Sequence, residues 1–453
     1  MKDRTLVNPT TSQTADDPNV KAKFNYHWVV LGTLAIVQII GSSISMAAGI
    51  MVTPLNDPDG SFGWSMAVIG GALATFFLVG AIFSPISGWL ADRYGTRKVM
   101  LLCGVLFASS MFLLGFVTNL WHFFLVFSLM LAITQSIAMG PMIAAVNVWF
   151  RNRLGMAAGL LWGAQGLGAG LMASGVAVLL ETVGWRATFW SIALIGGVLI
   201  LVAAAFFRSR PAEMGLRPYG VQADEPAEVV WSERVQGIRM KVFNQHIRKT
   251  KEFWNLPLIH HLGCTGHAII LIYSVPVAVD KGISLTAAAV ILTLISVFSI
   301  ISRFLAPMFA ERFGGKPAMA AALALQGGTV LMLFWASEAW TFYLFGALFG
   351  IGFGGEMSAY PVVNRQYFGS GPLSTFYGIE MMGAFMGHAL ATGLAGLVIY
   401  ATGSFNPVLA ISIGFSLVGM LVVLTLSSST EVLIPDWEES LPEEARTAPA
   451  PAD

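Results

Sequence analysis

Charged residues are scarce in this chain of 453 residues. Only 11% are Asp, Glu, Lys or Arg, whereas soluble domains carry roughly 25%. In their place 56% of the residues are hydrophobic, and the mean hydropathy is +0.71. Apolar runs of 18 or more residues recur along the sequence, each long enough to cross a hydrocarbon core of roughly 30 Å. The composition therefore excludes a soluble multidomain protein and predicts an all-α membrane protein.

Cysteines and catalytic motifs are also scarce. The two cysteines, Cys103 and Cys264, both lie in apolar runs and are too few for a disulfide framework. No phosphate-binding glycine loop and no catalytic constellation is present, so we expect no enzyme activity, no ATP hydrolysis, no cofactor and no nucleic-acid partner. The first apolar run is too long for a signal peptide, and no small-residue cleavage site follows it. We therefore expect it to be a retained membrane helix.

Twelve apolar segments are predicted to span the membrane, six on each side of one long polar segment. They are 27–55, 65–91, 98–118, 121–149, 155–182 and 185–207, then 256–279, 285–310, 317–336, 340–367, 374–401 and 406–427. The predicted organisation is an N-terminal segment 1–26, a six-helix bundle 27–207, a central loop 208–255, a second six-helix bundle 256–427 and an acidic tail 428–453.

The basic residues predict the orientation of these spans. With both termini placed in the cytoplasm, 22 of the 25 Lys and Arg residues fall on the cytoplasmic side. Only Arg186 and Lys281 fall on the far side, and Arg303 lies within a span. Cytoplasmic loops of membrane proteins carry such an excess of Lys and Arg. We therefore expect a multi-pass protein of the inner (plasma) membrane, surrounded by the lipid bilayer, with both termini cytoplasmic. We also expect the protein to be monomeric.

One loop motif occurs at corresponding places in the two halves. An acid, an Arg, an aromatic residue, a Gly and a base follow one another after the second span and again after the eighth. An acid at a helix end can pair with an Arg or with a neighbouring helix N-terminus. Small residues permit close helix packing and tight turns. The alternative is that the bases only satisfy the charge asymmetry. The predicted gating residues are Gly88, Asp92, Arg93, Gly95, Arg97, Lys98, Glu311 and Arg312.

The 88–98 loop resembles the signature loop of the major facilitator superfamily, although Thr96 shifts the first Arg of its final basic pair. The segment 149–159, followed by glycines at 163, 166, 168 and 170, is similar to the span 4–5 region of monocarboxylate and oxalate–formate porters. These resemblances imply a major facilitator fold, with twelve transmembrane helices in two six-helix pseudo-repeats. The stretch 163–170 has no Pro, unlike the corresponding motif of drug antiporters, which counts against drug efflux.

Charged residues inside the predicted spans are the candidates for substrate binding, because burying charge in a membrane is costly. The resemblance places a carboxylate-binding Arg at the position of Arg303, and a guanidinium fork suits an organic carboxylate. The alternative is that Arg303 extends to the membrane surface. Glu356, in the middle of the tenth span, could pair with Arg303, take a proton or belong to a static ion pair. Tyr360 and Gln135 complete the predicted substrate-binding residues, together with His267 and His388.

Proton coupling would need a titratable group inside the membrane. The candidates are Glu356, His267, His388 and Glu380, since imidazole and a desolvated carboxyl can both exchange protons near neutral pH. The alternative for each His is a hydrogen-bonded packing role. Ser299 stands where animal monocarboxylate transporters have an Asp, so their paired-Asp step is not implied. We expect no metal site, because the deep histidines have no local cluster of Cys or carboxylates.

These residues together predict a secondary active transporter that moves a small organic anion, a mono- or dicarboxylate, by alternating access. Protons are the candidate coupling ion, and a carboxylate exchanger without proton coupling is the main alternative. An efflux carrier or a non-transporting receptor ranks lower, because the central loop and tail are too short and polar for a signalling domain.

Overall fold

The computed structural model describes residues 25–56, 62–221, 229, 231–428 and 432–447. Nearly all of the predicted N-terminal segment 1–26, and the last six residues of the tail, lie outside these ranges. The described chain is almost entirely helical, as an apolar chain in a membrane must be to satisfy its backbone hydrogen bonds.

The first bundle contains six membrane-crossing segments. The elements are α1 (Tyr26–Asn56), α2 (Met66–Tyr94), α3 (Thr96–Leu114), a continuous rod made of α4 (Leu120–Phe123), the π-helical η1 (Phe124–Leu131) and α5 (Ala132–Trp149), and then α6 (Leu154–Phe206). The last of these holds two spans, because Gly184 breaks it with φ 76° and ψ 170°. A side chain other than Gly would be strained at that position.

The second bundle repeats this arrangement. Its elements are α8 (Lys251–Asp280), α9 (Leu285–Phe313), α10 (Gly315–Val330) continued by α11 (Met332–Trp335), α12 (Ala339–Ser358) continued by α13 (Tyr360–Phe368), α14 (Ser374–Thr402) and α15 (Asn406–Leu424). Within the described ranges, ten segments are long and apolar enough to span a membrane. Two less apolar segments, the glycine-rich first part of α6 and α12 with its Glu356, correspond to the other two of the twelve predicted spans.

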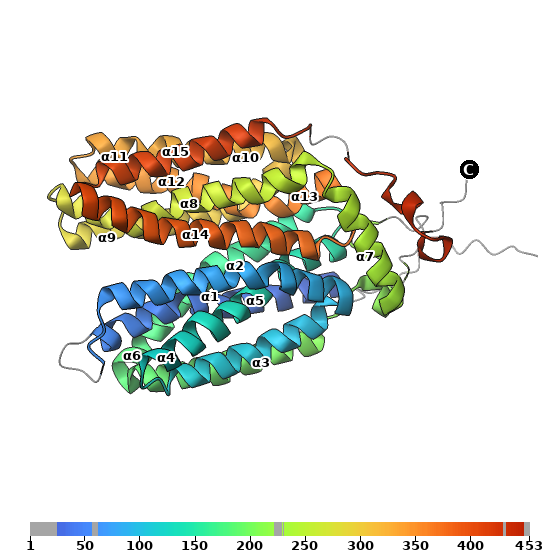
Figure 1. Ribbon diagram of the computed structural model, residues 1–453, viewed down its shortest axis with the longest axis horizontal. Coiled ribbons are helices and arrows are strands. Elements are labelled where there is room, and N and C mark those ends of the chain that lie inside the picture. Colours follow the sequence, from blue (N-terminus) through green and yellow to red (C-terminus); the bar gives the residue numbers. More distant parts are fainter. Residues whose placement is uncertain (1–24, 57–61, 222–228, 230, 429–431, 448–453) are drawn as a thin grey trace, which may run out of the picture.

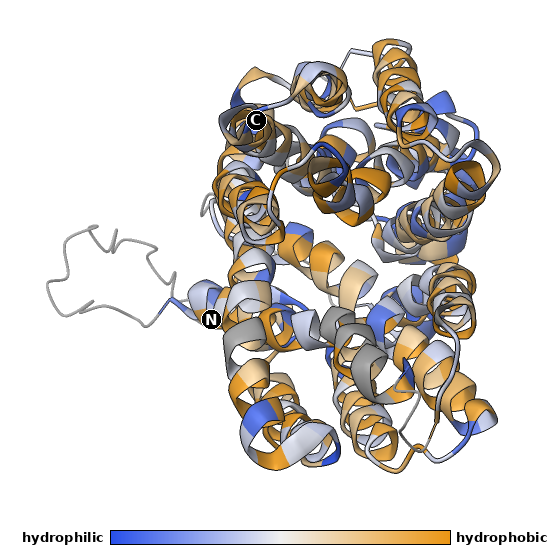
Figure 2. Cartoon of the chain, turned by 90° about the vertical axis from the view of Figure 1, so that its left-hand side faces the viewer, coloured by the Kyte–Doolittle hydropathy of each residue, from blue (hydrophilic) through white to orange (hydrophobic). Residues whose placement is uncertain are grey.

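The two bundles lie side by side, α1–α6 in one and α8–α15 in the other (Figure 1). They meet along two helix pairs, α2 with α14 and α6 with α9. From the end opposite α7, apolar residues are seen over much of the outer faces of both bundles (Figure 2). Large side chains there, such as Leu194, Ile195 and Leu397, are exposed. Such broad apolar exposure fits lipid contact.

The central polar segment contains a helix that the sequence did not predict, α7 (Glu233–Ile247), which lies across one end of the molecule beside the C-terminal tail (Figure 1). Arg239 on α7 lies over the Trp231 and Trp437 rings and donates hydrogen bonds to the Glu438 carboxylate and the Ala445 carbonyl. Burial raises the pKa of Glu438, but the hydrogen bond and charge of Arg239, with hydrogen bonds from the Thr447 N–H and hydroxyl, outweigh it and hold the pKa below its usual value. This end of the molecule is called the α7 end below.

Candidate functional site

Arg303 lies where the two bundles meet, and it is buried. Its Nη1 donates to Gln165 Oε1 on α6 at 2.9 Å, and its Nε donates to Ser299 Oγ at 3.1 Å. The guanidinium carbon lies 5.1 Å from the centre of the Phe353 ring on α12. The guanidinium is thus in direct contact with one amide, one hydroxyl and one aromatic face, all of them neutral groups. It points into the protein, which contradicts the alternative that it extends to the membrane surface.

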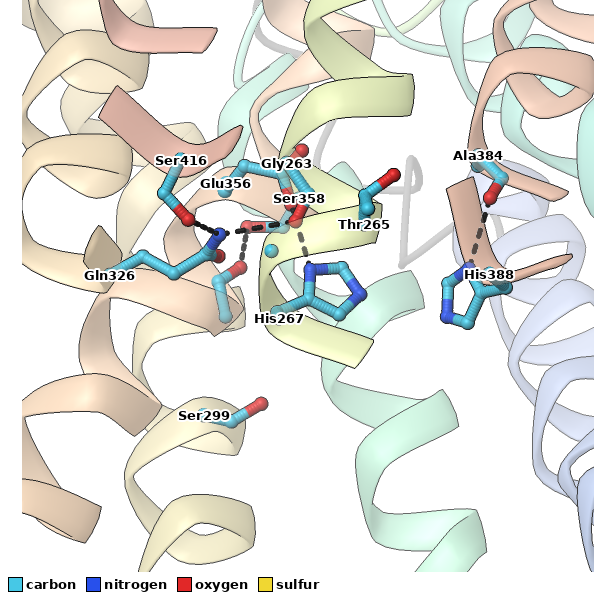
Figure 3. A network of polar contacts seen from close by, with 12 residues as sticks. Gly263, Thr265, His267, Ser299, Gln326, Glu356, Ser358, Ala384, His388 and Ser416 are labelled. Carbon is cyan, nitrogen blue, oxygen red and sulfur yellow. Dashed lines mark hydrogen bonds and ion pairs between the residues drawn. The ribbon is translucent and has the colours of Figure 1, made fainter. Parts of the chain in front are cut away.

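Glu356 lies one turn after Phe353 on α12 and is fully buried. Its Oε1 accepts a hydrogen bond from the Tyr360 hydroxyl at 2.9 Å, and its Oε2 lies 3.6 Å from His267 Nδ1. Figure 3 shows His267 on α8 directed at this carboxylate. Of the possibilities considered for Glu356, a direct pair with Arg303 is absent, since within the described residues no ion pair at or below 4.0 Å joins them.

His267 and His388 come from α8 and α14 and face one another. Their ring centroids are 5.3 Å apart, and His388 stacks on Phe77 of α2 at 5.1 Å. The Nδ1 of His388 is hydrogen-bonded to the Ala384 carbonyl at 3.0 Å (Figure 3). Because Phe77 belongs to the first bundle, the two histidines lie at the junction of the bundles.

Two further predicted residues lie away from this cluster. Glu380 is buried on α14, where its Oε2 accepts from Asn364 Nδ2 at 2.6 Å. Gln135 is buried on α5, one turn before Met139, whose sulfur accepts from Gln165. In the described part of the chain no hydrogen bond or ring contact joins Gln135 to Arg303 or Glu356.

The reason for expecting no metal site does not hold in the structure. The deep histidines do have a cysteine beside them, because Cys264 lies one turn before His267 on α8. One ligand atom from each of Cys264, His267 and His388 lies within 4.8 Å of the others.

The α7 end is closed by Asp92, at the end of α2. Its Oδ1 accepts from the Ser374 backbone N–H at 3.1 Å, and its Oδ2 accepts from the Thr375 N–H and hydroxyl, both at 2.7 Å. These donors form the first turn of α14, where free N–H groups and the helix dipole favour an anion. A Cβ on Gly88 would overlap the Ser374 carbonyl, so α2 and α14 are as close here as backbones allow.

A second carboxylate makes the equivalent contact from the other bundle. Glu311, at the end of α9, accepts from the backbone N–H groups of Leu154 and Gly155 at 3.0 and 2.9 Å. These donors form the first turn of α6. A Cβ on Gly155 would lie 2.5 Å from the Pro307 carbonyl. Each bundle therefore caps a helix of its neighbour.

The remaining predicted gating residues stay within their own bundle or the adjoining loops. Arg93 lies over the Trp89 and Tyr94 rings, and Arg312 lies over Phe313. Arg97 donates to carbonyls at the end of α6, and Lys98 forms an ion pair with Glu233 of α7 at 3.3 Å. Gly95 has φ 87°, which a tight turn between α2 and α3 requires.

The opposite end of the α2–α14 pair is looser. A Cβ added at Gly70 or Gly71 of α2, or at Gly393 of α14, would meet no atom within 4 Å. Gly378 of α14, by contrast, contacts the Ser84 carbonyl closely at the α7 end. The closest backbone approaches along this pair, at Gly88 and Gly378, therefore lie toward the α7 end.

Three residues of the site were not predicted. Gln165, Phe353 and Phe77 contact Arg303 or His388 across helix boundaries. Gln165 had one signal in the sequence, since it is a polar side chain in an otherwise glycine-rich apolar span. The two Phe residues had none, because Phe occurs throughout these spans.

The twelve helices in two bundles, the matched carboxylate caps and the buried charge at the junction define a polytopic membrane transporter. The family model for the Major Facilitator Superfamily matches residues 33–306 and 260–451. The chain belongs to this superfamily, whose members are transporters and not enzymes.

Individual relatives are distant. Monocarboxylate transporter 12 of Xenopus laevis is 22% identical over 76% of this chain and 76% of its own length. The oxalate:formate antiporter of Oxalobacter formigenes is 23% identical over 85% of this chain and 89% of its own length. The proton:xylose symporter XylE matches with a TM-score of 0.68 at 15% identity, over 90% of this chain and 97% of that one. FucP in its outward conformation matches with a TM-score of 0.65 at 15% identity, over 89% of this chain and 100% of that one.

Proposed function

We propose that this transporter carries a small organic anion, a mono- or dicarboxylate, by alternating access. The observation that carries the proposal is Arg303, a buried cation at the junction of the bundles. Within the described residues it has no ion-pair partner. A buried charge with no counter-ion in direct contact is costly unless a partner arrives. A substrate carboxylate can supply that partner by accepting two parallel N–H bonds from the guanidinium.

Arg303 is placed so that substrate binding can act on a contact between the two bundles. Its hydrogen bond to Gln165 joins α9 to α6, one of the two helix pairs along which the bundles meet. A substrate that competes for the guanidinium would change a contact between the bundles. Binding that differs between two conformations shifts their populations. The distant relatives named for monocarboxylate and for oxalate and formate support the same substrate class.

We place the protein in the inner (plasma) membrane with the α7 end in the cytoplasm. The excess of Lys and Arg in the loops of that end supports this orientation. In this orientation the described conformation is closed toward the cytoplasm by the Asp92 and Glu311 contacts. Cleavage of the central loop by a protease added to sealed inside-out vesicles, and its protection in right-side-out vesicles, would test the orientation.

Coupling separates two versions of the proposal, proton-coupled transport and exchange of one carboxylate for another. The predicted proton-coupling residues Glu356, His267, His388 and Glu380 are all at least partly buried. Liposomes loaded with buffer or with unlabelled carboxylate separate the two versions. Accumulation driven by a pH gradient into buffer-loaded liposomes supports proton coupling, whereas uptake that requires internal carboxylate supports exchange.

The test of the anion site is Arg303→Lys. An ammonium keeps the charge but cannot donate two parallel hydrogen bonds to a carboxylate. Losing part of a buried charged contact costs about 2–5 kcal/mol, so we expect carboxylate affinity to fall more than about tenfold. The measurement is uptake of a panel of labelled carboxylates into liposomes. Arg234→Lys is the matched control, because Arg234 is exposed on α7, and it should behave like the parent. Unchanged carboxylate affinity in Arg303→Lys would overturn the proposal.

A further inference from the structure

Cys264, His267 and His388 form a compact group of soft ligand atoms inside the second bundle. Cys264 and His267 lie one turn apart on the same side of α8, and His388 faces them from α14. One ligand atom from each lies within 4.8 Å of the others. A tetrahedral metal with bonds of about 2.0–2.3 Å needs ligand atoms about 3.3–3.8 Å apart. Small side-chain rotations that move each ligand atom inward by less than about an ångström would give that spacing.

Both imidazoles lie beside acceptors that favour the tautomer a metal ion needs. His388 Nδ1 faces the Ala384 carbonyl at 3.0 Å, and a carbonyl only accepts, so Nδ1 carries the hydrogen. His267 Nδ1 lies 3.6 Å from the Glu356 carboxylate, which is too long for a hydrogen bond, but the negative charge there attracts an N–H and so favours the same tautomer. In both rings Nε2 is then left with its lone pair. Figure 3 shows the two Nδ1 contacts directed away from the space between the rings. Metal-binding histidines are commonly oriented by such a carbonyl or carboxylate.

From this geometry we propose that Cys264, His267 and His388 bind one thiophilic transition-metal ion of the Zn²⁺ type, a site separate from the proposed anion site at Arg303. A thiolate with two imidazoles suits Zn²⁺ better than Mg²⁺ or Ca²⁺, which prefer oxygen ligands. Binding releases the Cys264 thiol proton to solvent and forms one S–Zn and two N–Zn bonds. The fourth position is open to water or an anion.

The charges around the group are compatible with a divalent ion. The Cys264 thiolate and the Glu356 carboxylate together would balance two positive charges. Arg303 lies close enough to act on His267 electrostatically, and the Phe353 ring contacts both its guanidinium and the His267 ring. His260 stacks on Tyr360, beyond Glu356. A bound ion would join α8 to α14 within one bundle, leaving the contacts at the α7 end unchanged.

The chain's cysteine content allows a selective test. The other cysteine of the chain, Cys103, lies buried on α3 in the first bundle. In the full-length variant Cys103→Ser, a thiolate-to-cobalt absorption band can come only from Cys264. We expect purified, chelator-treated Cys103→Ser protein to bind one equivalent of Co²⁺ with such a band, and the parent protein to bind one equivalent of Zn²⁺ by elemental analysis. Cys264→Ser should lose the band, and His388→Gln should bind about tenfold more weakly or worse.

Two outcomes would overturn the proposal. One is the absence of a thiolate band in Cys103→Ser protein, a result that does not depend on whether the site variants fold. The other is equal Zn²⁺ affinity in the parent and in Cys264→Ser protein that elutes as a folded species. Neither readout involves transport. Failure of the metal site would therefore leave the anion proposal untouched, and the reverse also holds.

Discussion

The two carboxylate contacts at the α7 end share one design but differ in their surroundings. Asp92 and Glu311 each end a helix of one bundle and cap the first turn of a helix in the other. Asp92 is 7% exposed and accepts three hydrogen bonds, one of them from the Thr375 hydroxyl. Glu311 is exposed and accepts two backbone hydrogen bonds. Charge-assisted hydrogen bonds weaken when water competes for the same groups.

This difference indicates that the α2–α14 side contributes more to closure than the α6–α9 side. The two contacts come from equivalent loops of a repeated architecture, so their strengths could be equal by symmetry. The acid with the shorter side chain is the one that is buried, and its helix also makes the tighter backbone approach, at Gly88. Variants that act on one contact at a time can therefore rank the two sides.

The largest effect is expected from Gly88→Ala. The added Cβ would overlap the Ser374 carbonyl, a backbone atom that cannot rotate away. The α7 end should then be unable to close on this side, and transport should be lost. Spin labels at Tyr94→Cys and Ser370→Cys, on a background without Cys103 and Cys264, would report a longer distance across the α7 end. Gly71→Ala on the same helix is the matched control, since its Cβ would enter open space. An unchanged label distance in Gly88→Ala would contradict the close packing.

Asp92→Asn should have the next largest effect. The amide keeps one acceptor but loses the charge, and its NH₂ group would face backbone donors. Hydrogen bonds to charged groups are worth about 1.5–3 kcal/mol, so we expect the closed population to fall about tenfold or more. Transport should slow, while carboxylate affinity stays within a few-fold, because Asp92 contacts α14 at the α7 end and not Arg303. Normal transport with weakened binding would show that Asp92 has another role.

The Asp92 and Glu311 contacts also show how far the sequence could predict this structure. The repeated acid-Arg-aromatic-Gly pattern predicted both loops, because a cap needs an acid at one fixed place near a helix end. Each of the twelve predicted spans corresponds to one helix, to part of a helix or to a run of joined helices, since hydropathy over about 20 residues is a strong signal.

Contacts between distant helices were harder to predict. Gln165 and Phe353 contact Arg303 only because α6, α9 and α12 meet, and no sequence period encodes that meeting. The contact between Cys264 and His267 could have been predicted, because a spacing of three residues places both on one face of a helix. We nevertheless expected no cysteine beside the deep histidines. The helix α7 was missed because polar, charged segments that lie on a protein surface lack the apolar signal of a span.

Glu311→Gln should have a smaller effect than Asp92→Asn in the same label and transport assays. The exposed carboxylate interacts with a helix N-terminus, a contact worth typically about 0.3–1 kcal/mol. The amide oxygen can still accept one of the two backbone hydrogen bonds. We expect the closed population to change no more than about five-fold. A larger effect than that of Asp92→Asn would reverse the ranking of the two sides.

The smallest effect is expected from Lys98→Gln. This variant tests the attachment of the loop to α7 without changing the Asp92 contact. Lys98 pairs with Glu233 of α7 at 3.3 Å, and both side chains are 66% exposed. Exposed ion pairs contribute little, because water and salt screen the charges and two flexible side chains must be ordered. Label distance and transport rate should both match the parent, also at high salt. If Lys98→Gln slowed transport as much as Asp92→Asn, the gate would depend on the attachment of α7 to this loop. The cap on α14 would then be secondary.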